Sequence, residues 1–233
     1  MYLLAYTLAA LLVFTNMVQV IALEGNIGSG KTSLCAELTK RLTTEAEVVC
    51  EPIKYWMDWN YNGQNFKMLK DIYESNDDLF DMQIFIQFSM LRTIWSAIEK
   101  AKIDNKKYVI CERTLASSVA VFSQNSFDSK YLTNKQISIL KFGLDTLRKL
   151  YPNAFIFDKV FYLYLSPNSC LERVRKRNRN DEDNIDLQYL TNLNIYYNHW
   201  FSIYFKPLTV NTCIKVNADN NISDLADNII AML

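Results

Sequence analysis

The chain has 233 residues, of which 50% are hydrophobic, so its length and composition suit one folded domain whose core needs neither a metal ion nor disulfides. The 25 lysines and arginines balance the 25 aspartates and glutamates, and a net charge of zero disfavours a broad basic surface. These bulk properties exclude an extensively disordered chain and argue against nucleic acid as a partner.

Residues 1–17 form an uncharged, largely apolar stretch that, together with Val18, reaches the roughly 18 residues needed to span a membrane. The stretch lacks the positive segment of a secretory signal and the arginines of a mitochondrial transit peptide. Three interpretations stay open: a membrane anchor, a secretory signal, and an extra apolar helix or upstream-start artefact. We expect a cytoplasmic protein with an apolar extension over residues 1–17 and one domain over residues 18–233.

A glycine-rich motif follows the first predicted strand, residues 18–23. It reads Gly25-Asn26-Ile27-Gly28-Ser29-Gly30-Lys31-Thr32 and fits the G-x-x-x-x-G-K-[ST] pattern that wraps the phosphates of a nucleoside triphosphate. Helical periodicity over 31–43 follows, so backbone N–H groups and a helix N-terminus would converge on an anion. Lys31 would place a charge beside the phosphates, and Thr32 would offer a hydroxyl to Mg²⁺. The alternative, a glycine turn that only caps a helix, fits these flanks poorly.

The second predicted strand, residues 47–50, ends at Glu51-Pro52. Because proline ends the strand and turns the chain, Glu51 is expected beside the phosphate loop, where its carboxylate could accept a proton from an attacking hydroxyl. Taken alone, Glu51 fits a solvated acid in a turn equally well. Trp56, about one helical turn later, offers an apolar wall for a planar base.

The third predicted strand, residues 108–111, is followed by Glu112-Arg113. Glu112 could bind the Mg²⁺ of the nucleotide, and Arg113 could hold the acceptor oxygen in line with the γ-phosphate. A purely structural Glu–Arg pair is the alternative.

A basic cluster occupies a predicted helix over 167–179. Arg173 and Arg177 fall on one face of this helix, and Arg175 and Arg179 on another. Like charges at this spacing repel, so the cluster is expected to bind triphosphate oxygens as a closing lid. An RNA-binding helix is the alternative, and the neutral overall charge argues against it.

Strand and helix patterns alternate along the whole chain. Two further strands are predicted over 159–165 and 213–217, and further helices over 64–74, 79–101, 133–150, 187–204 and 222–232. This alternation predicts an α/β fold with a parallel sheet covered by helices on both faces. Ligands bind such sheets beyond the carboxyl ends of the strands, and the glycine-rich motif, Glu51 and Glu112-Arg113 all follow strands there.

The five cysteines show no C-x-x-C spacing that would indicate a zinc or redox site. Cys50, Cys111 and Cys213 lie in apolar strand-like runs and are expected to be buried thiols. This usage indicates a reducing compartment.

Together these segments resemble the deoxyribonucleoside kinase family. The matching pieces are residues 21–32, Glu51-Pro52 with Trp56, Gln83, Glu112-Arg113 and 172–190. Their order and spacing fit the family over about residues 18–217. The resemblance implies a three-layer fold of the P-loop kinase type, with a five-stranded parallel sheet, a helical lid over about 173–186, and a homodimer.

The resemblance also implies roles for individual residues. Glu51 would be the general base on the sugar 5′-hydroxyl, and Arg113 would position that hydroxyl. Tyr73 and Glu182 would hold the 3′-hydroxyl, and Gln83 would pair with the base edge. Trp56 and Phe122 would pack on the base, beside the pocket residues Met90 and Ser118. ATP would bind the motif residues Gly25, Asn26, Gly28, Ser29, Gly30, Lys31 and Thr32 and the lid residues Arg173, Arg177 and Arg179, with Thr32 and Glu112 serving Mg²⁺.

Base preference follows from two pocket positions. Family members that prefer deoxycytidine or purines carry an arginine and an aspartate where this chain has the uncharged Met90 and Ser118. The chain therefore resembles the pyrimidine-preferring branch, and thymidine is expected first and deoxycytidine second. Val119 departs from the family, which usually has arginine there.

Three other functions compete with this interpretation. A thymidylate kinase would carry an arginine directly before the Glu-Pro pair, where this chain has Cys50. A GTPase would need an aspartate that reads guanine, and Asn134-Lys135-Gln136 lacks it. A catalytically silent nucleotide-binding protein would be expected to have lost Lys31 or Glu51, and both are present.

Overall fold

The structure is a computed structural model that describes residues 18–68, 79–179, 182–204 and 210–233. The apolar extension over residues 1–17 and Tyr73 lie outside these ranges. Within the described ranges, no helix is both long and apolar enough to cross a membrane.

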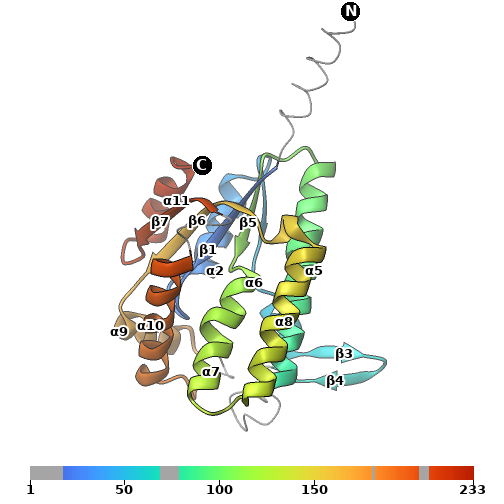
Figure 1. Ribbon diagram of the computed structural model, residues 1–233. Coiled ribbons are helices and arrows are strands. Elements are labelled where there is room, and N and C mark those ends of the chain that lie inside the picture. Colours follow the sequence, from blue (N-terminus) through green and yellow to red (C-terminus); the bar gives the residue numbers. More distant parts are fainter. Residues whose placement is uncertain (1–17, 69–78, 180–181, 205–209) are drawn as a thin grey trace, which may run out of the picture.

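A five-stranded sheet forms the middle of the molecule, and its strand order is β2-β5-β1-β6-β7. All four strand pairings are parallel, so the predicted α/β fold class is confirmed. The strands are β1 (Gln19–Glu24), β2 (Ala46–Val49), β5 (Tyr108–Glu112), β6 (Phe157–Tyr164) and β7 (Val210–Asn217). Each observed strand begins and ends within three residues of the bounds predicted for it. The central position of β1 places the glycine-rich loop that follows it in the middle of the sheet's carboxyl edge (Figure 1).

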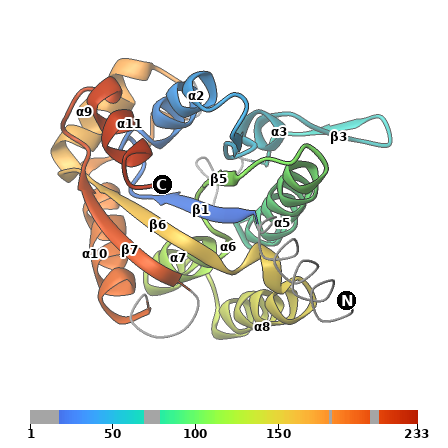
Figure 2. The ribbon, with the colours of Figure 1, turned by 90° about the horizontal axis from the view of Figure 1, so that it is seen from above.

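Helices cover both faces of the sheet, as Figure 2 shows from above. On one face, Ile21 and Leu23 of β1 pack with α2 (Lys31–Arg41) and α11 (Ile222–Ile230). On the other face, Val20 and Ala22 pack with α5 (Leu79–Ile103) and α8 (Asn134–Leu150). Successive side chains of a strand point to opposite faces, so a strand buried on both sides is apolar throughout.

Two helices lie in and next to the part of the chain that contains the predicted lid. Helix α9 (Pro167–Arg177) follows β6, and α10 (Leu187–Tyr204) packs its Leu193 and Tyr197 against Tyr162 of the sheet. These helices correspond to the predicted segments 167–179 and 187–204.

The helix predicted over 64–74 is wrong for residues 64–67, and residues 69–74 lie outside the described ranges. A hairpin of β3 (Trp59–Tyr61) and β4 (Gln64–Phe66) occupies this region, after the short helix α3 (Ile53–Met57). Asn62 and Gly63 both have positive φ, at 51° and 83°. An Asn-Gly pair is the preferred two-residue hairpin turn, and this local signal outweighs the helical periodicity.

A second segment was not predicted at all. Residues 115–128 form α6 (Leu115–Ser117), a π-helical turn over Ser118–Ser123, and α7 (Gln124–Asp128). Thr114 caps the start of this segment, its side chain accepting a hydrogen bond from Ser117 N. The serines disguise the helical pattern because such residues also favour turns, and here their hydroxyls bond to nearby carbonyl groups.

The expectation for the cysteines is partly wrong. Cys111 is buried, but Cys50 and Cys213 are exposed. Both belong to the edges of the sheet, since Cys50 follows β2 and Cys213 lies on β7. An edge strand has one flank without a neighbour, so an apolar strand pattern there does not imply burial.

Candidate active site

A cavity of about 810 Å³ opens beyond the carboxyl ends of the strands and gathers most of the predicted site residues. Predicted residues on its wall are Gly28, Ser29, Gly30, Lys31, Thr32, Glu51, Trp56, Gln83, Met90, Glu112, Arg113, Ser118, Phe122, Arg173, Arg177, Arg179 and Glu182. Gly25 and Asn26 are buried and do not line it. A volume in this range suits a cofactor and a small substrate bound side by side.

The glycine-rich loop approaches α9 so closely that Gly28 leaves no room for a side chain. Gly28 has φ 81°, and a Cβ atom there would lie 2.4 Å from the carbonyl oxygen of Cys170. Gly30 has φ 96° at the N-cap of α2, where the helix presents its free N–H groups to the cavity. The loop therefore keeps the open backbone that phosphate binding requires.

Gly28→Ala should destabilise the fold more than an alanine substitution at a glycine where backbone strain is the only cost. Gly63 has nearly the same φ, 83°, but a Cβ there meets no atom within 4 Å. Gly63→Ala should therefore lower the free energy of unfolding by about 1–2 kcal/mol, the usual cost of a left-handed residue. Gly28→Ala should cost more and also weaken ATP binding. Urea denaturation and calorimetry measure both effects, and equal losses in the two variants would contradict the close approach to α9.

Lys31 is buried beneath the loop and folded onto its carbonyl groups. Its Nζ donates to Gly25 O at 3.0 Å, to Asn26 O at 2.7 Å and to Ser29 Oγ at 3.4 Å. Burial, reinforced by the charge of Arg113, lowers the pKa of Lys31 to about 8. A desolvated cation in this position gains strongly from an incoming anion.

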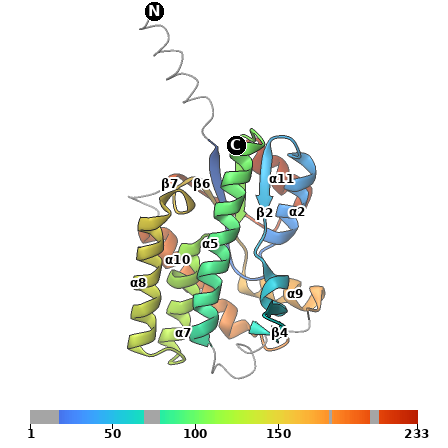
Figure 3. The ribbon, with the colours of Figure 1, turned by 90° about the vertical axis from the view of Figure 1, so that its right-hand side faces the viewer.

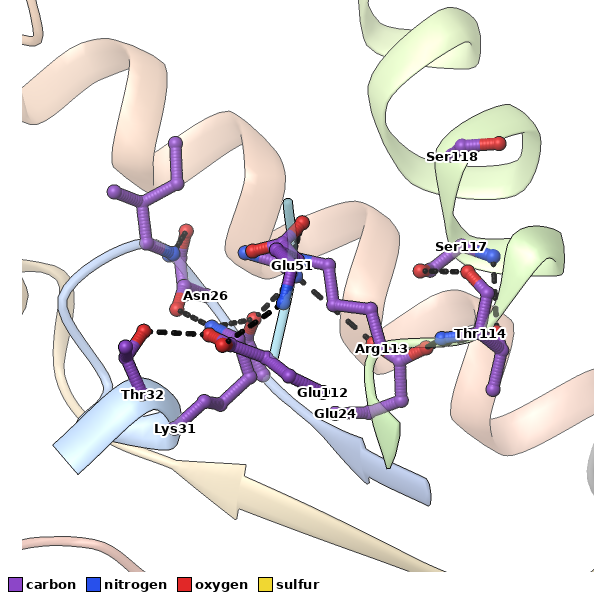
Figure 4. A network of polar contacts seen from close by, with 12 residues as sticks. Glu24, Asn26, Lys31, Thr32, Glu51, Glu112, Arg113, Thr114, Ser117 and Ser118 are labelled. Carbon is purple, nitrogen blue, oxygen red and sulfur yellow. Dashed lines mark hydrogen bonds and ion pairs between the residues drawn. The ribbon is translucent and has the colours of Figure 1, made fainter. Parts of the chain in front are cut away.

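Thr32, in the first turn of α2, contacts Glu112 at the end of β5. Thr32 Oγ1 donates to Glu112 Oε1 at 2.7 Å, and Glu51 N lies 3.3 Å from Glu112 Oε2 (Figure 4). Burial, followed by the nearby charge of Glu51, raises the pKa of Glu112. A hydroxyl and a carboxylate are hard oxygen donors, and a buried acid with a raised pKa would be stabilised by a divalent cation. The pair fits Mg²⁺.

Arg113 joins the loop to Glu51. Its Nε lies 2.8 Å from Glu51 Oε1 in an ion pair, and its Nη1 donates to Gly25 O at 2.7 Å and to Tyr197 Oη. Its backbone has φ 67°, an unusual value for a residue other than glycine. Such strained residues cluster at functional sites, where the surrounding contacts hold them.

Two buried residues behind Arg113 were not predicted to take part. Glu24, fully buried at the end of β1, accepts hydrogen bonds from Thr114 N and Thr114 Oγ1, both at 2.8 Å. Tyr197 Oη donates to Glu24 Oε2 at 3.3 Å. Burial raises the pKa of Glu24, and Arg113 opposes the rise. A charged residue closing an otherwise apolar strand was the signal that could have found Glu24.

The end of the cavity that is predicted to bind the nucleoside contains the side-chain amide of Gln83. Gln83 is buried on α5, and Ser123 Oγ lies 3.0 Å from Gln83 Oε1 and 2.9 Å from Ser118 O. Trp56 is held by its Nε1–H, which donates to Ser89 Oγ at 2.8 Å. The orientation of Gln83 therefore depends on Ser123, a residue the sequence did not single out.

The predicted lid residues pair with each other. Arg177 donates to both oxygens of Glu182 at 2.6 Å, and Arg179 Nη1 donates to Glu182 Oε1 at 3.0 Å. Arg173 Nη2 donates to Ala218 O at 2.9 Å. Glu182 and a backbone carbonyl therefore offset the repulsion between these arginines, for which triphosphate oxygens were the predicted partner.

The turn between β7 and α11 was also missed. Ala218, Asn221, Ile222 and Leu225 line the cavity next to Arg173. The predicted strand over 213–217 ends here, so the rule that ligands bind at the carboxyl ends of parallel strands applied to this turn as well.

The model of the family "Deoxynucleoside kinase" matches residues 21–232. The chain is 29% identical to deoxycytidine kinase 2 of Gallus gallus over 211 residues, 84% of this chain and 78% of that one. It is 26% identical to deoxycytidine kinase of Homo sapiens, covering 77% of this chain and 74% of that one. It is 28% identical to mitochondrial thymidine kinase 2 of Homo sapiens over 182 residues, 78% of this chain and 63% of that one. The predicted resemblance is confirmed, and the chain belongs to the deoxynucleoside kinase family of enzymes, which phosphorylate deoxynucleosides for salvage.

Proposed function

We propose that this enzyme transfers the γ-phosphate of ATP, bound with Mg²⁺, to the 5′-hydroxyl of pyrimidine deoxynucleosides, thymidine before deoxycytidine. One observation carries the proposal: the Glu51–Arg113 ion pair at 2.8 Å lines the same cavity as the phosphate loop. A base and a cation beside a triphosphate site are what transfer to a hydroxyl requires.

The donor would occupy the loop side of the cavity. Backbone N–H groups at the start of α2 and the desolvated Lys31 would hold the phosphates. Thr32 and Glu112 would hold Mg²⁺, whose positive charge would offset the negative charge of the phosphates. The lid, residues 173–186, would supply Arg173, Arg177 and Arg179, of which the last two must leave Glu182 to meet phosphate oxygens.

The acceptor would lie on the opposite side. Glu51 would take the proton of the 5′-hydroxyl, and Arg113 would hold that oxygen and the Glu51 carboxylate in line with the γ-phosphate. Glu182, once released by the arginines, and Tyr73 would bind the 3′-hydroxyl. This exchange of partners would couple sugar binding to closure of the lid.

The base would lie between Trp56 and Phe122, with its edge on Gln83. Met90 and Ser118 beside it are buried and uncharged, so neither supplies a charge to satisfy a purine edge. The relatives named above are deoxycytidine and thymidine kinases, and both of these nucleosides are pyrimidines. The test is kcat/KM for ATP-dependent phosphorylation of the four deoxynucleosides, and a purine at the head of the ranking would refute the preference.

Introducing the missing charged pair should change the base preference. The double substitution Met90→Arg with Ser118→Asp should lower the kcat/KM ratio of thymidine to deoxycytidine by about 10–100-fold, the range that pocket contacts control. Met90→Arg alone buries an unpaired cation and should reduce stability and turnover with every nucleoside. Steady-state kinetics on the two single variants and the double variant measure the coupling, and additive effects would contradict a paired site.

Residues 18–233 are proposed to act as one domain and to form a homodimer through α5 and α8. These helices lie side by side (Figure 3), and Gln87 Nε2 donates to Leu140 O at 3.3 Å. Phe88 and Phe142 on them are 59% and 74% exposed, which is unusual for large aromatic side chains. A second copy would cover them, and Phe142→Glu should then yield monomers in sedimentation experiments.

The free cysteines fit a reducing compartment such as the cytoplasm.

A further inference from the structure

Three potential metal ligands from distant parts of the sequence meet beside the phosphate loop. Cys35 on α2, Cys50 after β2 and Glu112 at the end of β5 have their ligand atoms within 4.8 Å of one another. The two cysteines are 15 residues apart, so no spacing pattern reveals the pair. Parallel pairing of β2 with β5 brings Cys50 next to Glu112.

The spacing of these atoms suits a tetrahedral ion. Zinc binds thiolate sulfur at about 2.3 Å and carboxylate oxygen at about 2.0–2.2 Å, so the ligand atoms of one site lie about 3.5–4 Å apart. The observed separations of at most 4.8 Å need little movement to reach this value. Cys35 is buried and Cys50 is exposed, which gives an ion a path from solvent and leaves room for water as a fourth ligand.

The chemistry of the donors is selective. Two thiolates favour a soft or borderline cation over Mg²⁺, whereas the carboxylate accepts either. Glu112 retains free lone pairs, because each carboxylate oxygen has two acceptor positions and each receives one hydrogen bond. Lys31 and Arg113 lie close enough to act on the Glu112 charge and would offset the excess negative charge of a zinc site with three anionic ligands.

We propose that Cys35, Cys50 and Glu112 form a binding site for a thiophilic divalent cation of the Zn²⁺ class. Binding requires the two thiols to lose their protons, so each ion bound releases up to two protons to the buffer. Zinc on Glu112 also takes up the carboxylate assigned to Mg²⁺ and should inhibit phosphoryl transfer. That inhibition, unlike the binding itself, rests on the proposed function.

The test is a calorimetric titration of the protein with Zn²⁺ alone, with the thiols kept reduced by a phosphine and nucleotide absent. Cys50→Ser is the informative variant because Cys50 is exposed and its replacement leaves the core intact. Cys213→Ser is the matched control, since Cys213 is equally an exposed, free cysteine beside an edge of the sheet. We expect one Zn²⁺ per chain, a Kd at least about 10-fold higher in Cys50→Ser, and no change in Cys213→Ser.

The possible outcomes distinguish a failure of the proposed metal site from a failure of the proposed function. Zinc binding that is absent, or equally strong in Cys50→Ser, overturns the site. Cys50-dependent binding without inhibition of transfer overturns only the sharing of Glu112 with Mg²⁺. Cys50-dependent binding by a protein that phosphorylates no deoxynucleoside would leave the metal site standing and refute the proposed function.

Discussion

Glu51→Gln should lower kcat for thymidine phosphorylation by about 10²–10⁴-fold, the usual contribution of a general base. The substitution keeps the size of the side chain and an oxygen that can face Arg113, so the Kd for thymidine should change by less than about threefold. Initial rates at saturating ATP measure the first quantity. Quenching of tryptophan fluorescence measures the second, because Trp56 lines the cavity.

Glu47→Gln provides the matched control for Glu51→Gln. Glu47 lies on the same strand, β2, and pairs at 2.7 Å with the surface residue Lys100, away from the cavity. Its kcat and Kd should both equal those of the unchanged protein. Turnover within tenfold of normal in Glu51→Gln would show that another group accepts the proton and would remove Glu51 as the base.

Arg113→Met should abolish transfer and also lower the free energy of unfolding by about 3–5 kcal/mol at pH 7, the cost of leaving a buried charge without its partner. Arg113 is buried between Glu24, 3.9 Å away, and Glu51, 2.8 Å away. Removing its charge leaves the Glu24 carboxylate in a fully desolvated position. Urea denaturation measures the loss.

The loss in Arg113→Met should depend on pH in a defined direction. Burial already raises the pKa of Glu24, and removing the opposing charge of Arg113 raises it further. An acid whose pKa is higher in the folded state destabilises the fold as the pH rises through the interval between its unfolded and folded pKa values. The variant should therefore be closest to normal stability near pH 5 and furthest from it near pH 8.

Glu24→Gln tests whether the charge of the Glu24 carboxylate causes this loss of stability. Glutamine can still accept from Thr114 through one oxygen, so the single variant should fold. In its background, Arg113→Met should cost less, and the added pH dependence should disappear. A loss below about 1 kcal/mol in Arg113→Met, or strictly additive effects, would contradict a structural role for this ion pair.

Short-range pattern was enough to predict the glycine-rich loop and the strand and helix that flank it. The G-x-x-x-x-G-K-T motif is contiguous, and its strand and helix have clear periodicities. Glu51 and Glu112-Arg113 were placed correctly for a related reason: each directly follows a strand, and parallel strands bring their carboxyl ends to one edge. The roles given to these residues stay proposals.

What the sequence did not predict depends on contacts between distant residues. Glu24 and Tyr197 are 173 positions apart and share a hydrogen bond, and the Cys35–Cys50–Glu112 cluster exists only because β2 pairs with β5. Burial of edge residues such as Cys213 depends on neighbours that periodicity does not reveal. The pairing of Arg177 with Glu182 is local. However, ATP was the expected partner of Arg177 and the sugar 3′-hydroxyl that of Glu182, and spacing alone does not rank these possibilities.

The identity of the acceptor is tested most directly by incubating the protein with ATP and Mg²⁺ and, in parallel, with thymidine or thymidine monophosphate. We expect thymidine to be converted to its 5′-monophosphate, no diphosphate to form from the monophosphate, and the conversion of thymidine to be absent in Lys31→Ala. Conversion of thymidine monophosphate but not thymidine would contradict a hydroxyl acceptor beside Glu51 and would identify a monophosphate kinase instead.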